Sequence, residues 1–382
     1  MELQLALIVP LMATQGFASP ELGQAANRAL DLCKEFGDTP EVFMALTQVC
    51  LFYSTRPDYK KALEIGERTV KLAEKLNDPM FKAISFYNTN WPWLNLGDHT
   101  QALELQDRLI EVYDPEKHGY LAYLFGYDLG ILSLAFSSWC LWMLGFQDQG
   151  SERIERAIIQ ARNRKHPHTL AFALVGVIAM QWFLRNRQKI DKYVDELEPI
   201  AYENGFIFWI GHVLIYRGEQ KVLAGDVKGG GAQINEGFAT ISATGSETCL
   251  TRLSARMADA CLQTGAIDKG LKIVDEGLEF KDKFEELYME AELLRLKGEL
   301  LQMKGADDKE IQEYFQKAIQ IAQGQKAKSW ELRAVMSLCR LFQKQNKKNE
   351  AKKILEEIYS WFSEGFNQPD LIEAKALLNE LT

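Results

Sequence analysis

Two short stretches of this 382-residue chain carry residue types that could do chemistry. His166 and His168 stand in RKHPHTL, but a zinc site takes four ligands, and no cluster of Cys, Asp or Glu accompanies the pair. We therefore interpret both as a loop and the N-terminal cap region of a helix. The second stretch is the glycine-rich GDVKGGGAQINEG, residues 225–237, whose backbone N–H groups could hold a phosphate. It follows no predicted strand and lacks a Lys-Ser/Thr ending, so we interpret it as a helix-hairpin turn.

Catalysis is not predicted for this chain. His99 and His118 have no Ser or Cys partner at a spacing that suggests a nucleophile and its base. The sequence contains no GxxxxGKS/T nucleotide loop, and no pair of aspartates in the strand context of a cyclase. We therefore expect a protein that is not an enzyme and that binds no metal and no cofactor.

A third group of residues points to binding. Aromatic residues concentrate in the middle of the chain, and Arg, His and Glu follow on the same predicted helices. Most such rings fill the core between stacked hairpins, and Glu292 with Arg295 can form a simple salt bridge within one helix. Side chains that reach a concave surface would bind a peptide or a small ligand. The candidate binding-groove residues are Tyr127, Trp139, Trp142, Trp182, Trp209, His212, Tyr216, Arg217, Arg252, Arg256, Glu292 and Arg295.

The elements that must position these residues repeat along the chain. Small residues recur at intervals of 40, 48, 80 and 40 positions, each about five residues after a predicted turn. A second series recurs every 40 positions, about seven residues before a turn. Two antiparallel helices approach most closely at one level, where only Gly, Ala or Ser lets the backbones meet. The first series is Ala62, Ala102, Gly150, Gly230 and Gly270, and the second is Gly218, Ala258 and Gly298.

Between these marks the apolar residues follow helical spacing, and alternating strand patterns are absent. Thr39, Pro40 and Glu41 have the form of a helix start. The predicted fold class is all-α, a right-handed solenoid of about nine helix hairpins of about 40 residues. We expect residues 1–382 to form this single solenoid, with residues 369–382 as a C-terminal capping helix. The predicted turns lie at Gly16, Pro57, Gly97, Gly145, Asn186, Gly225, Gly265, Gly305 and Asn346.

The interval of 48 positions places about eight extra residues between positions 114 and 128. Tyr120, Tyr123, Phe125 and Tyr127 stand close together there, and that many aromatic residues argue against disorder. We expect this segment to fold over the groove or to cap a layer. Contact with a ligand and simple packing are both open for it.

The opening run from Leu3 to Ala13 is apolar, as a secretory signal would be. It carries Glu2 in place of Lys or Arg, and it precedes Gly16, where each later hairpin has its first helix. We expect it to be a helix of the array and the natural chain to continue upstream. Six scattered cysteines without a CxxC pair predict a cytoplasmic protein, and the short apolar runs predict no membrane partner. A net charge of -9 argues against a nucleic-acid partner.

Helix hairpins with small residues at these levels resemble the tetratricopeptide (TPR) class, in a longer variant of about 40 residues. The segments LLRLKGELLQ, from Leu293, and PDLIEAKALLNEL, from Pro369, resemble the C-terminal region of large bacterial signalling ATPases. Many proteins of that group carry an N-terminal class III adenylate or guanylate cyclase domain, then an ATPase domain, then helical repeats. The resemblance covers nearly the whole chain and is most specific at the C-terminal end.

We therefore predict a non-enzymatic regulatory scaffold that binds a protein or peptide partner, or ATPase or cyclase domains upstream of it. The alternative is a sensor with a small-molecule effector in the central aromatic groove. A deep closed cavity lined by Trp142, Trp209 and Arg217 would favour the sensor. An open groove with exposed arginines and aromatic rows would favour the peptide binder.

Overall fold

The computed structural model describes residues 23–24, 27–28, 30–31 and 37–381, and the regular structure of these residues is helical, without a strand. The elements run from α3 to α21, with one short 3-10 helix, η1 (Leu287–Met289). The all-α prediction is confirmed. The predicted first helix, from Leu3 to Ala13, and the turn at Gly16 lie outside the described residues.

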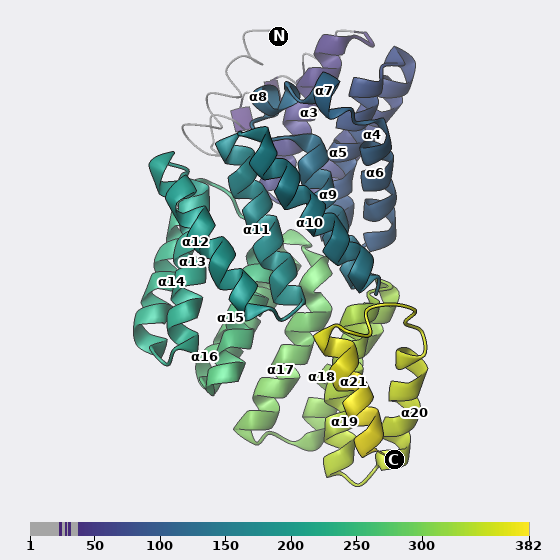
Figure 1. Ribbon diagram of the computed structural model, residues 1–382, viewed down its shortest axis with the longest axis vertical. Helices are drawn as coiled ribbons and strands as arrows, with labels where there is room; N and C mark the ends of the chain where they lie inside the picture. Colours follow the sequence, from purple (N-terminus) through teal and green to yellow (C-terminus); the bar gives the residue numbers. More distant parts are fainter. Residues whose placement is uncertain (1–22, 25–26, 29, 32–36, 382) are drawn as a thin grey trace.

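Eight helix hairpins follow one another in the described part of the chain (Figure 1). Thr39 caps the first of them as predicted, because its hydroxyl accepts a hydrogen bond from the backbone N–H of Val42. The hairpins are α3 (Pro40–Thr55) with α4 (Tyr59–Leu76), α5 (Pro79–Asn95) with α6 (His99–Val112), α9 (Leu129–Met143) with α10 (Gln147–Arg164), α11 (Pro167–Phe183) with α12 (Arg187–Glu203), α13 (Ile207–Leu223) with α14 (Val227–Ala243), α15 (Leu250–Thr264) with α16 (Ile267–Phe284), α17 (Glu290–Lys304) with α18 (Asp308–Gly324), and α19 (Lys328–Lys344) with α20 (Lys348–Tyr359).

The predicted turns from Pro57 to Asn346 all fall between the two helices of a hairpin. Gly225 and Gly305 have φ angles of 96° and 80°, a left-handed conformation that glycine adopts without steric cost. Asn346 takes the same conformation with a φ of 60°, which Asn tolerates better than most residues. The turn residues therefore end one helix and reverse the chain.

The extra residues between α6 and α9 fold into two short helices, α7 (Pro115–His118) and α8 (Leu121–Phe125). Asp114, which ends the preceding helical pattern, also caps α7, because its carboxylate accepts a backbone N–H of that helix. Phe125 and Tyr127 are buried, whereas Tyr120 and Tyr123 are exposed. The segment thus turns two of its four rings inward and leaves two on the surface.

The small residues lie where the two helices of a hairpin approach each other closely. A Cβ atom added at Gly230 of α14 would stand 2.5 Å from the carbonyl oxygen of Gly218 in α13, closer than real Cβ atoms come. At Gly298 of α17 it would stand 2.5 Å from the fully buried ring of Phe315 in α18. The structure therefore confirms close backbone approach at Gly218 and Gly230, whereas the space at Gly298 is filled by the ring of Phe315.

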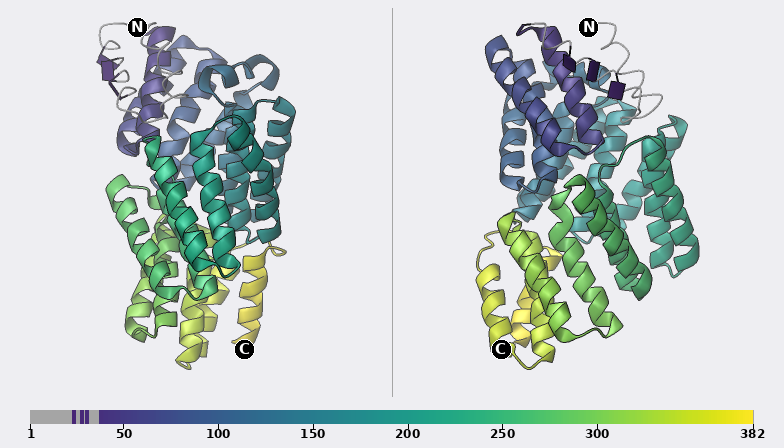
Figure 2. Two further views of the ribbon diagram at one scale, coloured as in Figure 1. Left: turned by 90° about the vertical axis from the view of Figure 1, so that its left-hand side faces the viewer. Right: turned by 180° about the vertical axis from the view of Figure 1, so that it is seen from behind.

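The hairpins wind into a superhelix that touches itself. In Figure 1, α3 to α6 and α17 to α21 lie toward opposite ends of the long axis, with α12 to α14 along one side, and Figure 2 shows the same order from behind. The end of α3 meets the loop before α15, where the backbone N–H of Glu247 donates to the carbonyl oxygen of Thr55. The hydroxyl of Tyr59 lies 3.1 Å from that of Thr248. These contacts between distant segments enclose the centre of the superhelix.

The helix α21 (Pro369–Glu380) packs on the last hairpin, against α19 and α20. Leu371, Ala374 and Leu377 are buried in this contact. Its first turn also reaches back to the end of α11, through charged residues that are described with the site.

Gly298→Leu should lower the free energy of unfolding by about 1 to 3 kcal/mol, because overpacking forces a buried ring to move. Gly324→Leu is a matched control, since nothing lies within 4 Å of the Cβ position at Gly324, on the exposed end of α18. Urea unfolding followed by circular dichroism measures both variants. Equal destabilisation by the two substitutions would contradict the packing level assigned to Gly298.

Candidate functional site

A pocket occupies the centre of the superhelix. It encloses about 990 Å³, part of which is open to solvent. Its wall comes from the first helix of six hairpins, namely α3, α5, α9, α11, α13 and α15, together with the segment after α7 and the loop before α15. A solenoid of hairpins produces this arrangement, because its first helices face the concave side.

Aromatic rings make up much of the wall. The ring centroids of Trp91 and Phe136 are 4.8 Å apart, and those of Phe172 and Trp209 are also 4.8 Å apart. Phe136 and Phe172 connect the two pairs at 5.8 Å, and Tyr127 lies 5.5 Å from Phe172. These separations are those at which aromatic pairs attract each other. The rings therefore form one layer that presents a large apolar surface to the pocket.

Among the lining residues, the polar side chains without hydrogen-bond partners gather on the side formed by α13 and the start of α15. Arg252 is 1% exposed, its Nε and Nη1 have no hydrogen-bond partner, and it makes no ion pair with a described carboxylate. Ser246 Oγ, Trp209 Nε1 and His212 Nε2 are buried and also have no hydrogen-bond partner. Buried polar atoms in proteins nearly always have one. Four side chains of this wall therefore have hydrogen-bonding capacity that the described chain does not use.

His212 is a neutral member of this wall. Burial, with the nearby charges of Arg252 and Arg256, lowers the pKa of His212 to about 3. Its Nδ1 lies 3.0 Å from the carbonyl oxygen of Phe208, so Nδ1 carries the proton and Nε2 is an acceptor. Among the lining residues, Arg252 is consequently the one fixed positive charge, and no carboxylate accompanies it.

The structure brings together five of the twelve predicted groove residues. Phe136 and Phe172, which were not predicted, stand between them. The other seven predicted residues lie elsewhere, and their surroundings explain why. The five that line the pocket are Tyr127, Trp139, Trp209, His212 and Arg252.

Trp142 and Trp182 lie in the core between parts of the superhelix, which corrects their placement in the groove. Trp142 stacks on Phe183 with centroids 4.8 Å apart and meets Trp330 of α19 at 4.6 Å. Trp182 donates from Nε1 to Asp259 of α15 at 3.1 Å. Both tryptophans are near the C-terminal ends of their helices, beyond the level of the pocket.

Tyr216, Arg217 and Arg256 also lie outside the pocket wall. Arg256 is fully buried, pairs with Glu219 at 2.6 Å and lies 4.5 Å above the ring of Tyr216. Arg217 faces α12 and pairs with Asp195 at 2.8 Å. Consecutive helical residues point about 100° apart, so Tyr216 and Arg217 meet different neighbours.

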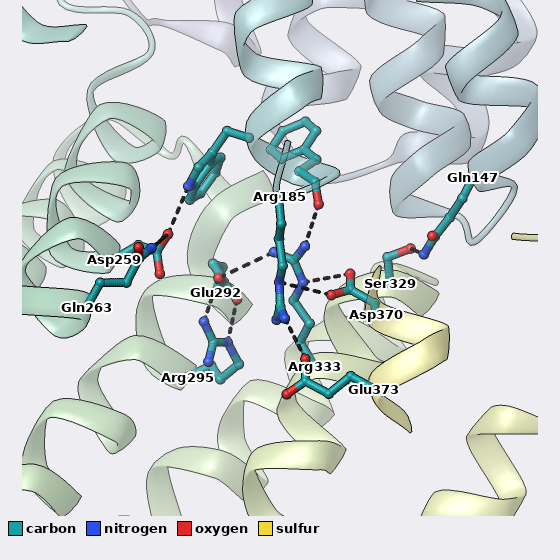
Figure 3. Close-up of polar contacts among 12 residues, drawn as sticks. Gln147, Arg185, Asp259, Gln263, Glu292, Arg295, Ser329, Arg333, Asp370 and Glu373 are labelled. Carbon is teal, nitrogen blue, oxygen red and sulfur yellow. Dashed lines mark hydrogen bonds and ion pairs between the residues drawn. The ribbon is translucent and has the colours of Figure 1, made fainter. Parts of the chain in front are cut away.

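Glu292 and Arg295 form a salt bridge with each other within α17. This is the simple pairing that the sequence allowed, and not a binding role in a groove. Arg295 donates to Glu292 from Nε at 2.7 Å and from Nη2 at 2.8 Å. Figure 3 shows this pair beside Arg333 of α19, whose Nη1 lies 3.8 Å from Glu292. The groove placement of both residues is thus corrected, because they belong to a buried network of charges.

That network joins the middle of the chain to its C-terminal end (Figure 3). Arg333 donates from Nε to Asp370 of α21 at 2.8 Å and from Nη2 to the carbonyl oxygen of Phe183. Arg185, in the turn after α11, lies 3.1 Å from the other oxygen of Asp370 and pairs with Glu373 as well. We call Arg185, Arg333, Asp370 and Glu373 the clasp. It holds residues up to 188 positions apart in the sequence.

Several wall residues were not predicted from the sequence. Phe136 precedes the predicted Trp139 by three positions, and this spacing puts both on one helix face, so a signal for Phe136 was present. Ser246 and Thr248 had no such signal. They reach the wall because the loop before α15 meets the end of α3, which no local pattern specifies.

The two stretches that were considered first for chemistry serve the helices instead. His166 caps α11 by accepting a hydrogen bond from the backbone N–H of Thr169, and His168 lies 2.8 Å from the carbonyl oxygen of Gly126. In residues 225–237 the chain turns at Gly225 and then continues as α14, so the turn interpretation holds only for the start. Within the described residues, no three His, Cys, Asp or Glu side chains are grouped to hold a metal ion, and no helix has the length and apolar character needed to cross a bilayer.

Neither a protein-family model nor a curated protein sequence matches the chain. Solved structures do match it. A Rap protein complexed with competence and sporulation factor is 10% identical, with 100% of this chain and 99% of that chain covered and a TM-score of 0.62. This chain has a TPR-like helical repeat fold. At such low identity the likeness concerns the fold alone.

Two further structures match with lower scores. The apo form of the quorum sensor NprR from B. thuringiensis is 11% identical, with 94% of this chain and 97% of that chain covered and a TM-score of 0.49. A signal transduction ATPase with numerous domains and a tetratricopeptide repeat sensor, from Pyrococcus horikoshii, is 11% identical, with coverage of 95% and 55% and a TM-score of 0.40.

Asp370→Ala should lower the free energy of unfolding by about 3 to 5 kcal/mol, because it removes the carboxylate that pairs with the buried Arg333 at 2.8 Å and leaves Glu292 at 3.8 Å. Glu196→Ala is the control, since Glu196 pairs with Arg162 near the surface, where an ion pair contributes about 0 to 1 kcal/mol. Chemical denaturation of both variants gives the comparison. If Asp370→Ala costs no more than Glu196→Ala, the clasp does not hold the two segments together.

Stability should fall as the pH falls below about 6.5, partly because of His212. Its pKa is 6.5 as a model value and about 3 in the folded protein, so between these values the unfolded chain binds a proton that the folded protein does not. The contribution of neutral His212 is complete above pH 6.5 and is lost toward pH 3, at about 1.4 kcal/mol per pH unit. The slope of unfolding free energy against pH should therefore be smaller by about that amount in His212→Gln. Urea unfolding over a pH series tests this, and parallel profiles would contradict it.

Proposed function

We propose that this chain is a non-enzymatic regulatory module that binds an effector in its central pocket and presents the bound state to a partner protein. The observation that carries the proposal is the pocket, whose wall combines a layer of aromatic rings with one positive charge that has no carboxylate partner. Sites for small ligands have this character, mostly apolar with a few placed polar groups.

The geometry favours the effector sensor over a scaffold with an open groove. An open groove would expose its arginines, whereas Arg256 and Arg295 are buried against carboxylates and Arg252 lies in the pocket wall. The wall differs from the one expected for the sensor, because it contains Trp209 but neither Trp142 nor Arg217. We propose a small molecule or a short peptide as the effector, since pockets for such ligands are mostly apolar with a few placed polar groups.

The likeness to the Rap protein supports a binding role. That structure matches the whole chain in fold and is a complex with competence and sporulation factor. In this chain, the proposed place for a bound factor is the central pocket.

A protein partner would bind differently to the chain when its pocket holds an effector. Distant segments meet at the pocket, where Thr55 contacts Glu247, and away from its lining residues at the clasp. A ligand that changes the width of the pocket would shift these segments and the outer helices attached to them. The partner that we propose is a signalling ATPase or cyclase domain, on the resemblance of the C-terminal segments to such proteins.

Leu51→Trp should block binding of the effector. Leu51 lines the pocket from α3 and is half-buried, so a larger ring can enter the pocket without disturbing the core. Ile159→Trp is the control, because Ile159 is 55% exposed on α10 and is not a lining residue. Compounds that copurify with each protein are released by denaturation and identified by mass spectrometry, and their affinity is then measured by calorimetry.

We expect Leu51→Trp to weaken binding at least about tenfold, or about 1.4 kcal/mol, and the control to bind as the wild type does. Equal binding by both variants would place the ligand elsewhere and overturn the proposal. The same preparations should neither hydrolyse nor cyclise ATP. Turnover that a point mutation in this chain abolishes would overturn the non-enzymatic part.

A further inference from the structure

Buried arginines of the described chain fall into two groups. Three of them are paired with carboxylates at hydrogen-bonding distance, as a buried guanidinium requires. The fourth, Arg252, is as buried as the others and is the one that lines the pocket. The three pairs are Arg256 with Glu219 at 2.6 Å, Arg295 with Glu292 at 2.7 Å, and Arg333 with Asp370 at 2.8 Å.

Arg252 has no carboxylate partner, and the side chains beside it, Tyr216, Cys249 and Tyr288, are neutral. Glu286 is near enough to influence it, but this carboxylate accepts a hydrogen bond from Thr251 at 2.7 Å and makes no ion pair with Arg252. Burial raises the pKa of Glu286 to about 7, whereas a close ion pair would hold it low. The ring of Trp139 lies 5.4 Å from the guanidinium carbon, and a ring face accepts no strong hydrogen bond from Nε or Nη1.

Among the four buried arginines of the described chain, Arg252, which lines the pocket, is the one without a carboxylate partner. The chain supplies a carboxylate to each of the other buried arginines, so the absence of one beside Arg252 leaves a charged donor available at the wall. Ser246 Oγ and Trp209 Nε1 add neutral groups without partners on the same wall. An anion in the pocket would satisfy Arg252 and would have two further donors within the wall.

We infer that the pocket takes a ligand with an apolar body and a single carboxylate, and that Arg252 pairs with this carboxylate. The inference rests on the proposed function and adds the chemical class of the ligand. A guanidinium matches a carboxylate with two parallel hydrogen bonds, and the aromatic layer receives the body. A phosphate ester carries about two negative charges, and among the described lining residues Arg252 is the one cation.

Two sources share this chemistry, the C-terminus of a short apolar peptide and a medium-chain fatty acid. The first probe pair is therefore the peptide Ac-Leu-Val-Gly-Phe-Leu as its free acid and as its C-terminal amide. The second pair is decanoate and decanol. The two members of each pair differ in charge and little else, so a preference within a pair shows that the carboxylate is recognised. The comparison between the pairs shows whether the ligand is a peptide or a fatty acid.

Isothermal titration calorimetry on the full chain measures the preference. The wild type should bind the charged member of one pair about 10 to 100 times more tightly than the neutral member, as a hydrogen bond to a charged group implies. Arg252→Met should bind both members alike. Arg217→Met is the matched control, because Arg217 pairs with α12 outside the pocket, and it should keep the wild-type preference.

A second measurement needs no ligand. Arg252→Met removes a buried charge that has no carboxylate partner, so the melting temperature of the ligand-free protein should rise. Arg256→Met breaks a buried ion pair and leaves Glu219 with Arg187 alone, at 3.3 Å, so the melting temperature should fall. A fall of similar size in both variants would show that Arg252 is structural and would overturn the inference.

The calorimetric outcomes separate the inference from the proposed function. If the wild type binds both members of each pair equally and Leu51→Trp loses binding, the inferred role of the carboxylate is overturned. The pocket would then still be the binding site. Binding that persists in Leu51→Trp would overturn the proposed function itself. Failure of all four probes to bind the wild type would overturn the inference.

Discussion

The architecture depends on how closely the two helices of each hairpin approach. Gly218 and Gly230 let the backbones of α13 and α14 meet where any Cβ atom would collide, and Gly298 makes room for the buried ring of Phe315. Small residues recur about every 40 positions, so successive hairpins pack with similar geometry and stack in one sense. This repetition keeps the first helices on the concave side. The pocket is a consequence of that arrangement, because six first helices converge on it.

Closure of the superhelix is made by polar contacts as much as by apolar packing. At one side Thr55 and Glu247 join through their backbones, and at the other Arg333 and Asp370 pair while almost fully buried. A buried ion pair adds little net stability, but leaving one member alone is costly. The clasp therefore favours the arrangement in which α11, α19 and α21 meet. Apolar packing alone would be compatible with several arrangements of these helices.

The pocket combines two kinds of wall. Rings from neighbouring helices support one another and form a firm apolar layer, to which Phe136 and Phe172 are central. Polar atoms without partners lie beside this layer, among them Nε and Nη1 of Arg252, whose guanidinium carbon is 5.4 Å from the ring of Trp139. A folded protein normally satisfies such groups, and exceptions are expected where function requires them. For the proposed ligand this wall implies an orientation, with the apolar part against the rings and the polar part toward Arg252 of α15.

The sequence by itself determined the helices, the turns from Pro57 to Asn346 and the levels of closest approach, because each depends on residues within one hairpin. It also pointed to Trp209 and Arg252 among the residues of the wall. Only the tertiary structure decided which aromatic and charged residues share the pocket. Trp142 lies three positions after Trp139 and yet packs against Trp330 of α19. Which residue of α9 meets α19 depends on the rotation between successive hairpins, added up over all the hairpins that separate the two helices. No local sequence pattern encodes this accumulated rotation, to which α7 and α8, inserted before α9, also contribute.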